Sequence, residues 1–109
     1  MIATVRVYAG VTDTAIAAIA DRSADIGAML CGVPGCVGCQ LIRTRDGLVV
    51  VIIGDDEPAL VEAGRRFVAW TRRHVPTFRS KALPTVWAGD VLLSTPYHPG
   101  RIGSVLSGD

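Results

Sequence analysis

The sequence of 109 residues has few charges and no long apolar run, and each scarcity excludes a class of protein. Charged residues make up 19% of the chain, against about 25% in an average soluble protein. The net charge of +1 provides no basic patch for nucleic acid or an anionic membrane. The longest apolar run, LVVVII, is far shorter than the roughly 20 residues that a membrane-spanning helix needs. We therefore expect no nucleic-acid partner and no membrane partner.

Cysteine is also scarce, and all three cysteines lie in one stretch, CGVPGCVGCQ at 31–40. The spacing C-x4-C-x2-C is the first part of a plant-type iron–sulfur signature, but no fourth cysteine follows. On an extended strand, Cys36 and Cys39 are three positions apart and point to opposite faces. We therefore expect no metal and no cofactor, and we interpret Cys31, Cys36 and Cys39 as packing residues. A redox pair of Cys31 and Cys36 is the alternative.

The odd number of cysteines fits poorly with a secreted disulfide framework. The first ten residues, MIATVRVYAG, alternate apolar and polar side chains and lack the charged and apolar segments of a signal peptide. Both observations lead us to expect a cytoplasmic protein.

Hydrophobic patterning predicts four strands and two helices in the order β-α-β-β-α-β. The strands are expected at 3–10, 36–44, 48–54 and 85–94, and the helices at 12–30 and 55–75. Thr12 or Asp13 suits the start of the first helix, and Pro58 suits the first turn of the second. Asp46 and Gly47 form a hairpin signal between the two middle strands. This order predicts an α+β, ferredoxin-like sandwich at 1–94, followed by a tail at 95–109.

In that fold two helices cover one face of a four-stranded antiparallel sheet and leave the other face open. An exposed antiparallel face normally alternates apolar and polar residues, but the strand from Leu48 to Ile53 is apolar throughout. Both of its faces should therefore be buried. We expect the second face to meet a second copy of the chain in a two-fold homodimer.

The layout, with VPGCVGCQLIRTRDGLVVVIIGDDEPALVEAGRRFVAWTRRHVP at its centre, resembles the dimeric α+β barrel superfamily. It is most similar to the small antibiotic biosynthesis monooxygenases. This resemblance implies oxidation of an aromatic or polyketide-like molecule, without metal or flavin, in a pocket between sheet and helices. The resemblance implies that haem-degrading relatives combine an Asn on the first strand, a Trp on the third strand and a His on a helix. Here the first strand supplies Arg6 and Tyr8 but no Asn, and 48–54 has no Trp. The haem-degrading pattern is therefore incomplete.

An enzyme of this type would use His74 as the base, because its ordinary pKa of about 6.5 suits proton abstraction. Tyr8 or Arg6 would then stabilise an enolate. The expected pocket walls are Phe67, Trp70 and Trp87.

Each assignment has a simpler alternative. His74 at a helix end is favoured by the helix dipole. Arg6 and Tyr8 could pair across a dimer interface, and the three aromatic residues could belong to the core. The alternative function is a non-catalytic dimer that binds a small apolar ligand or has a structural role.

Overall fold

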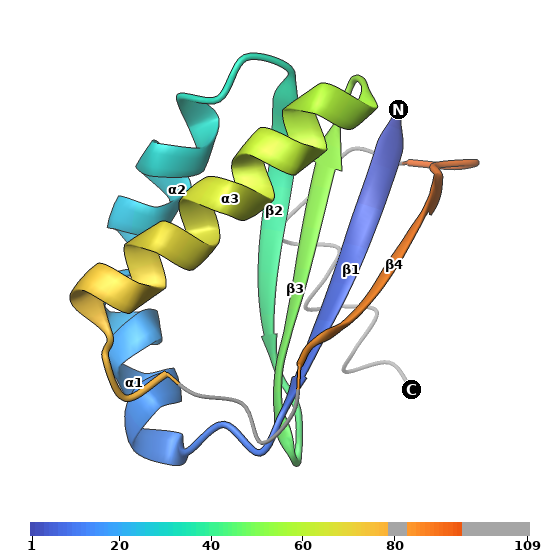
Figure 1. Cartoon of the computed structure of the whole chain (residues 1–109). Helices are drawn as coiled ribbons and strands as arrows, with labels where there is room; N and C mark the ends of the chain where they lie inside the picture. The colour runs from blue at the N-terminus through green and yellow to red at the C-terminus, as the bar shows by residue number, and fades with distance from the viewer. Residues whose placement is uncertain (79–82, 95–109) are drawn as a thin grey trace, which may run out of the picture.

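The structure, a computed structural model, describes residues 1–78 and 83–94 (Figure 1). The expected tail, 95–109, lies outside the described residues. In chain order the elements are β1 (Ile2–Ala9), α1 (Asp13–Asp21), α2 (Ser23–Cys31), β2 (Cys36–Arg43), β3 (Gly47–Gly54), α3 (Glu57–His74) and β4 (Thr85–Asp90). No helix in this part of the chain is both long enough and apolar enough to cross a membrane.

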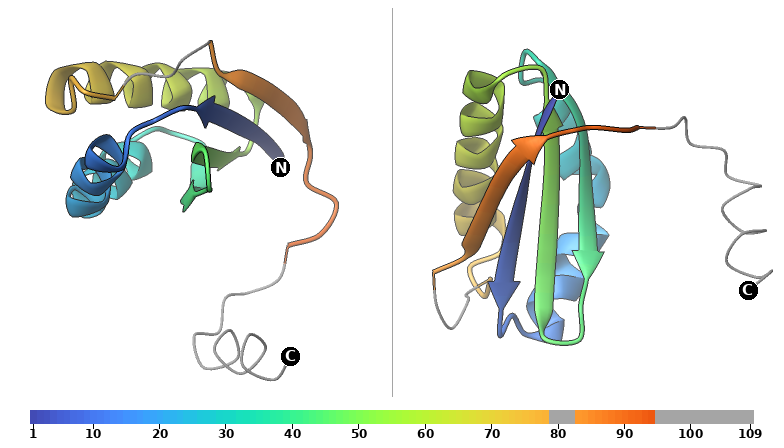
Figure 2. Two further views of the ribbon diagram at one scale, coloured as in Figure 1. Left: turned by 90° about the horizontal axis from the view of Figure 1, so that it is seen from below. Right: turned by 90° about the vertical axis from the view of Figure 1, so that its right-hand side faces the viewer.

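The four strands form one antiparallel sheet in the order β2-β3-β1-β4. All three helices lie on the same side of this sheet (Figures 1 and 2). The predicted α+β, ferredoxin-like fold is therefore confirmed.

The expected single helix at 12–30 is instead two helices that meet at Arg22. Arg22 leaves helical geometry, with φ −110° and ψ 19°, and both flanks α1 at its C-terminus and precedes α2. The predicted start is confirmed, since the Thr12 hydroxyl accepts a hydrogen bond from the Ala15 amide.

Helix α3 begins as the sequence predicts. The Asp56 carboxylate accepts a hydrogen bond from the Ala59 amide at 3.0 Å, and Pro58 lies in the first turn. Three basic residues, Arg72, Arg73 and His74, occupy the last turn, where the negative end of the helix dipole favours positive charge. These features stabilise the two ends of α3.

The hydrophobic core lies between the helices and the sheet. Leu48, Val50 and Ile52 of β3 point into it and are at most 2% exposed. Phe67, in the middle of α3, is fully buried against the same layer. This arrangement covers one face of β3, as its apolar run predicts.

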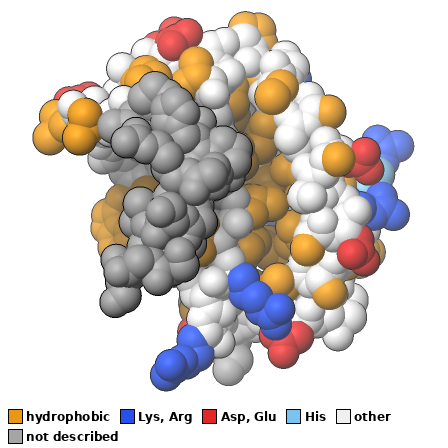
Figure 3. Space-filling model, turned by 180° about the vertical axis from the view of Figure 1, so that it is seen from behind, with side chains coloured by type: hydrophobic (Ala, Val, Ile, Leu, Met, Phe, Trp, Pro, Cys, Tyr) orange, Lys and Arg blue, Asp and Glu red, His pale blue; other side chains and the backbone are white. Residues whose placement is uncertain are grey.

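The other face of the sheet, here called the open sheet face, is covered by none of the helices in the described residues (Figure 2). Side chains alternate between the two faces along each strand. Those that the strand register places on this face are all uncharged, and many are apolar. They are Ala3, Val5, Val7, Ala9, Gly38, Gln40, Ile42, Val49, Val51, Ile53, Thr85, Trp87 and Gly89. Figure 3 shows apolar side chains gathered on this side of the molecule.

Strand β2 has an irregularity that changes the direction of its cysteines. The register shifts between Cys36 and Gly38, so Cys36 pairs with Gly54 and Cys39 pairs with Ile52. Both partners belong to the helix-facing row of β3, and both cysteines pack against the core. The expectation that Cys36 and Cys39 point to opposite faces is therefore wrong, because a bulge adds one residue to the strand.

Candidate functional site: a groove between α3 and β1

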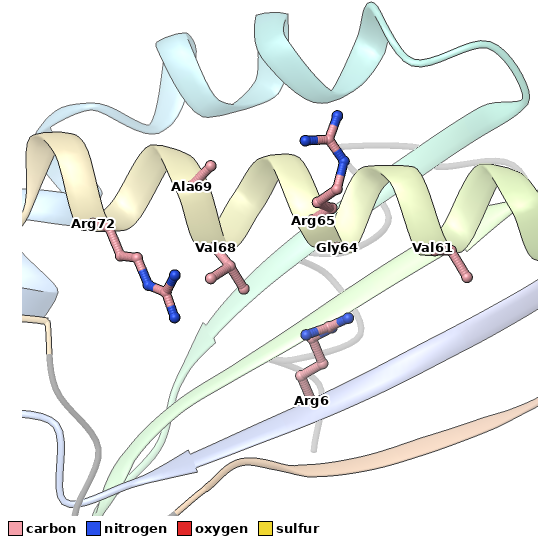
Figure 4. Close-up of a pocket in the computed structure, with 7 residues that line it drawn as sticks. All are labelled: Arg6, Val61, Gly64, Arg65, Val68, Ala69 and Arg72. Carbon is pink, nitrogen blue, oxygen red and sulfur yellow. The ribbon is translucent and has the colours of Figure 1, made fainter.

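A pocket of about 390 Å³ lies between α3 and β1 (Figure 4). We call it the α3–β1 groove. Its lining residues are Arg6, Val61, Gly64, Arg65, Val68, Ala69 and Arg72. The volume falls within the range of about 300–1,000 Å³ typical of small-molecule sites.

Arg6 forms the base of the groove. It belongs to the helix-facing row of β1, between Val50 of β3 and Val86 of β4 in the strand register. Val86 is 46% exposed, so α3 does not cover β4 at this level. The groove follows from this partial cover, because α3 packs over the centre of the sheet and leaves its β4 side open.

Gly64 makes room for the Arg6 side chain. A methyl group at position 64 would overlap the Nη2 atom of Arg6 and lie 2.9 Å from its Cζ. Figure 4 shows the guanidinium rising from β1 toward Gly64, with Val61, Val68 and Arg72 directed from α3 toward β1. Glycine inside a helix is about 1 kcal/mol less favourable than alanine. The close approach of the Arg6 guanidinium to α3 therefore lowers the stability of the helix.

The groove carries positive charge. No Asp or Glu is among its described lining residues. Arg65 is neutralised by Glu62, which also binds Arg66, with nitrogen–oxygen distances of 2.7 Å to each. These hydrogen bonds lower the pKa of Glu62 to about 2. Arg6 and Arg72 form no ion pair with any residue that the structure describes.

Three buried polar atoms on β1 have no hydrogen-bond partner within the described structure. They are the Thr4 hydroxyl oxygen, the Arg6 Nε and the Tyr8 hydroxyl oxygen. All three side chains belong to the helix-facing row of β1. Buried polar groups are normally satisfied, so a row of three unsatisfied ones calls for an explanation.

His74 lies on the other flank of α3. Its ring stacks on Trp70 with a centroid distance of 4.8 Å, and its Nδ1 lies 3.3 Å from Nη1 of Arg22. The His74 side chain is exposed, and neither His74 nor Trp70 lines the α3–β1 groove.

The remaining predicted site residues are also dispersed. Tyr8 and Phe67 are buried in an aromatic cluster with Phe78, where the ring centroids of Tyr8 and Phe78 are 5.1 Å apart. Trp87 lies on the open sheet face and is 61% exposed. In the described structure these side chains and His74 do not come together around one cavity, and of the six predicted site residues only Arg6 lines the groove. Their catalytic and binding roles stay predictions.

Two further hollows, of about 370 and 380 Å³, lie along α3. One has Val61 in common with the groove and also contacts Glu57, Pro58 and Glu62. The other has Arg72 in common with the groove and also contacts Val75, Pro76 and Phe78.

The sequence contained one signal for this site that its periodicity did not reveal. Gly64 lies in the interior of a helix, and such a glycine often marks close packing or a functional contact. The sequence pattern could not show that the residue packed against Gly64 is Arg6 of the first strand.

No group of three His, Cys, Asp or Glu side chains in 1–78 and 83–94 is placed to hold a metal ion. Cys36 and Cys39 are partly buried, and Cys31 is exposed. Burial and the nearby thiols of Cys36 and Cys31 raise the pKa of Cys39 to about 11. Cys39 is therefore a protonated thiol at neutral pH and a poor metal ligand in that state.

The chain shares its fold with solved structures of antibiotic biosynthesis monooxygenase-like proteins. A candidate antibiotic biosynthesis monooxygenase from Bordetella bronchiseptica has a TM-score of 0.65 and 17% identity, covering 84% of this chain and 97% of that one. SnoaB, a cofactor-independent oxygenase from Streptomyces nogalater, has a TM-score of 0.54 and 19% identity, covering 88% and 97%. A MhuD variant with two manganese protoporphyrin IX molecules per active site has a TM-score of 0.59 and 16% identity, covering 89% and 100%.

No family profile and no curated protein sequence matches the chain. At identities of 16–19% the structural likeness establishes the fold and not the activity. The predicted resemblance to antibiotic biosynthesis monooxygenases is confirmed at the level of the fold.

Proposed function

We propose that this protein binds a small, largely apolar molecule in the α3–β1 groove. The observation that carries the proposal is the lining itself, in which Val61 and Val68 form an apolar wall beside the guanidinium of Arg6 (Figure 4). Small-molecule sites combine such a wall with a few fixed polar groups. The open side of the groove at β4 gives the ligand a path of entry.

Cofactor-independent oxidation of an aromatic or polyketide-like ligand is the second candidate function. It is supported by the likeness to SnoaB, which is a cofactor-independent oxygenase. Arg6 would stabilise negative charge that develops on an oxygen of the substrate. The described lining contains no His, Asp or Glu, so no base faces the ligand there, and binding is the better supported function.

We also propose that the protein is a cytoplasmic homodimer that associates through the open sheet face. A wholly uncharged, largely apolar face is unusual for a monomer and matches a second copy of itself, because no charge on it needs an opposite partner. Residues 91–94 lead away from the sheet after β4, with Leu92 95% and Leu93 82% exposed (Figure 2). These leucines would be buried if they reached the second copy.

A thermal-shift screen with aromatic polyketides, quinones and haem tests the binding proposal. A ligand that binds only the folded state raises the melting temperature in proportion to RT ln(1 + [L]/Kd). We expect one chemical class to raise it, and the effect to disappear in Val68→Trp, which fills the groove with a large uncharged side chain. Stabilisation that persists in Val68→Trp would place the site elsewhere and contradict the proposal. Oxygen consumption with the stabilising ligands then separates binding from oxidation.

A further inference from the structure

The base of the α3–β1 groove holds a cation that has no counterion among residues 1–78 and 83–94. Arg6 is half-buried, its Nε atom is buried, and no acceptor among the described residues binds that atom. Leaving a buried polar group unsatisfied costs about 1–3 kcal/mol, and more when the group is charged. A methionine at this position would fill similar space without that cost.

Gly64 is a second residue that is unfavourable for folding stability, in addition to Arg6. Gly64 lies opposite Arg6 inside α3, where alanine would favour the helix by about 1 kcal/mol. Any larger side chain would displace the guanidinium from its position at the base of the groove. Both residues cost folding stability at the same point, which indicates that the site is maintained for binding.

The charges around the groove identify the chemistry of the ligand. Arg72 adds a second positive charge without an acidic partner in the described structure, whereas Arg65 is already bound to Glu62. A guanidinium offers only donors, and its planar geometry matches the two oxygens of a carboxylate. The adjacent wall of Val61 and Val68 favours an apolar body on the same molecule.

We propose that the ligand is an apolar organic acid whose carboxylate is bound by Arg6 and whose hydrocarbon or aromatic body lies against α3. This inference rests on the proposed function, and it adds the charge and the chemical class of the ligand. Arg6 is the anchoring residue, Arg72 strengthens the positive potential, and Gly64 keeps the guanidinium accessible.

Isothermal titration calorimetry with 2-naphthoate and 2-naphthamide tests the inference, because the two probes have nearly the same shape and differ in charge. We expect the wild-type protein to bind 2-naphthoate about ten- to a hundredfold more tightly than 2-naphthamide, as a hydrogen bond to a charged group implies. Added chloride should reduce this difference, because salt screens the attraction.

Two variants and one control assign the effect to Arg6. In Arg6→Met, 2-naphthoate should bind as weakly as 2-naphthamide, while the melting temperature of the unliganded protein stays the same or rises. In Gly64→Ala the helix should gain stability, while the preference for 2-naphthoate falls. Arg43→Gln removes an arginine that binds Asp13 outside the groove and should leave the preference unchanged.

The outcomes separate this inference from the proposed function. Equal binding of both probes, weakened by Val68→Trp and not by Arg6→Met, would overturn the inference that the ligand is an acid and leave the groove as the binding site. Absence of binding by either probe would overturn both. A large loss of stability in unliganded Arg6→Met would show that Arg6 has a structural role and would also overturn the inference.

Discussion

The pKa and reactivity of the Cys39 thiol depend on its surroundings in the fold. The bulge in β2 turns it toward the core, and burial together with the Cys36 and Cys31 thiols raises its pKa to about 11. Cys31, at the end of α2, is exposed. The chemical reactivity of the two thiols should therefore differ.

Alkylation with iodoacetamide at about pH 8 should label Cys31 at least about tenfold faster than Cys39, because only an accessible thiolate reacts. Mass spectrometry of the digested protein measures both rates in one sample. The same reaction in denaturant is the control, and there the two rates should converge. Equal rates in the folded protein would contradict the buried position of Cys39.

The sequence alone could not predict this environment. Strand alternation places Cys36 and Cys39 on opposite faces, and one extra residue in the strand reverses that result. Gly35 and Gly38 flank the irregular segment, and glycine within a strand often marks a bulge. The signal was present, but its effect on the register depended on pairing with β3.

At the scale of elements, α3 divides the candidate functional residues between two flanks. The flank near β4 carries Val61, Gly64 and Val68, and these line the groove with Arg6. The flank near α2 carries Trp70 and His74, which contact each other and Arg22. The orientation of this helix therefore decides which residues can reach one ligand.

Asp56→Ala should destabilise the protein by about 1 kcal/mol, because it removes the acceptor for the Ala59 amide at the start of α3. Urea unfolding followed by circular dichroism measures the change. Asp55→Ala is the matched control, since only the backbone amide of Asp55 has a described hydrogen bond, to Gly35. Equal effects of the two substitutions would show that charge near the helix end, and not the cap, supplies the stability.

Element boundaries followed from local chemistry where that chemistry was strong. The caps at Thr12 and Asp56 and the turn at Asp46–Gly47 are visible in the sequence because each uses a side chain or backbone freedom that few residues offer. The break between α1 and α2 has no such marker, because Arg22 is a good helix former. That break depends on packing, which one sequence does not reveal.

At the scale of the whole molecule, β3 is apolar on both faces for two different reasons. Val50 is fully buried under the helices, whereas Val51 lies on the open sheet face. Arg6 and Val5 on β1 alternate in the same way. The sheet therefore separates the side of the proposed ligand site from the proposed dimer interface.

Val51→Asp should yield a folded monomer, because the aspartate would be exposed to water in the monomer but buried without a partner in the dimer. Val50→Asp should unfold the chain, because the same charge would enter the core. Sedimentation velocity and circular dichroism distinguish these results. A wild-type monomer, or a Val51→Asp protein that sediments like the wild-type dimer, would contradict the proposed interface.

The most direct test of the account is an amide NMR titration of the wild-type protein with 2-naphthoate. If the α3–β1 groove is the binding site, the largest shift changes should occur at Arg6, Gly64 and Val68 and approach saturation. Trp70 and His74, on the opposite flank of α3, should change little. The largest changes at His74 and Trp70, with none at Gly64, would contradict the account and restore the opposite flank as the site.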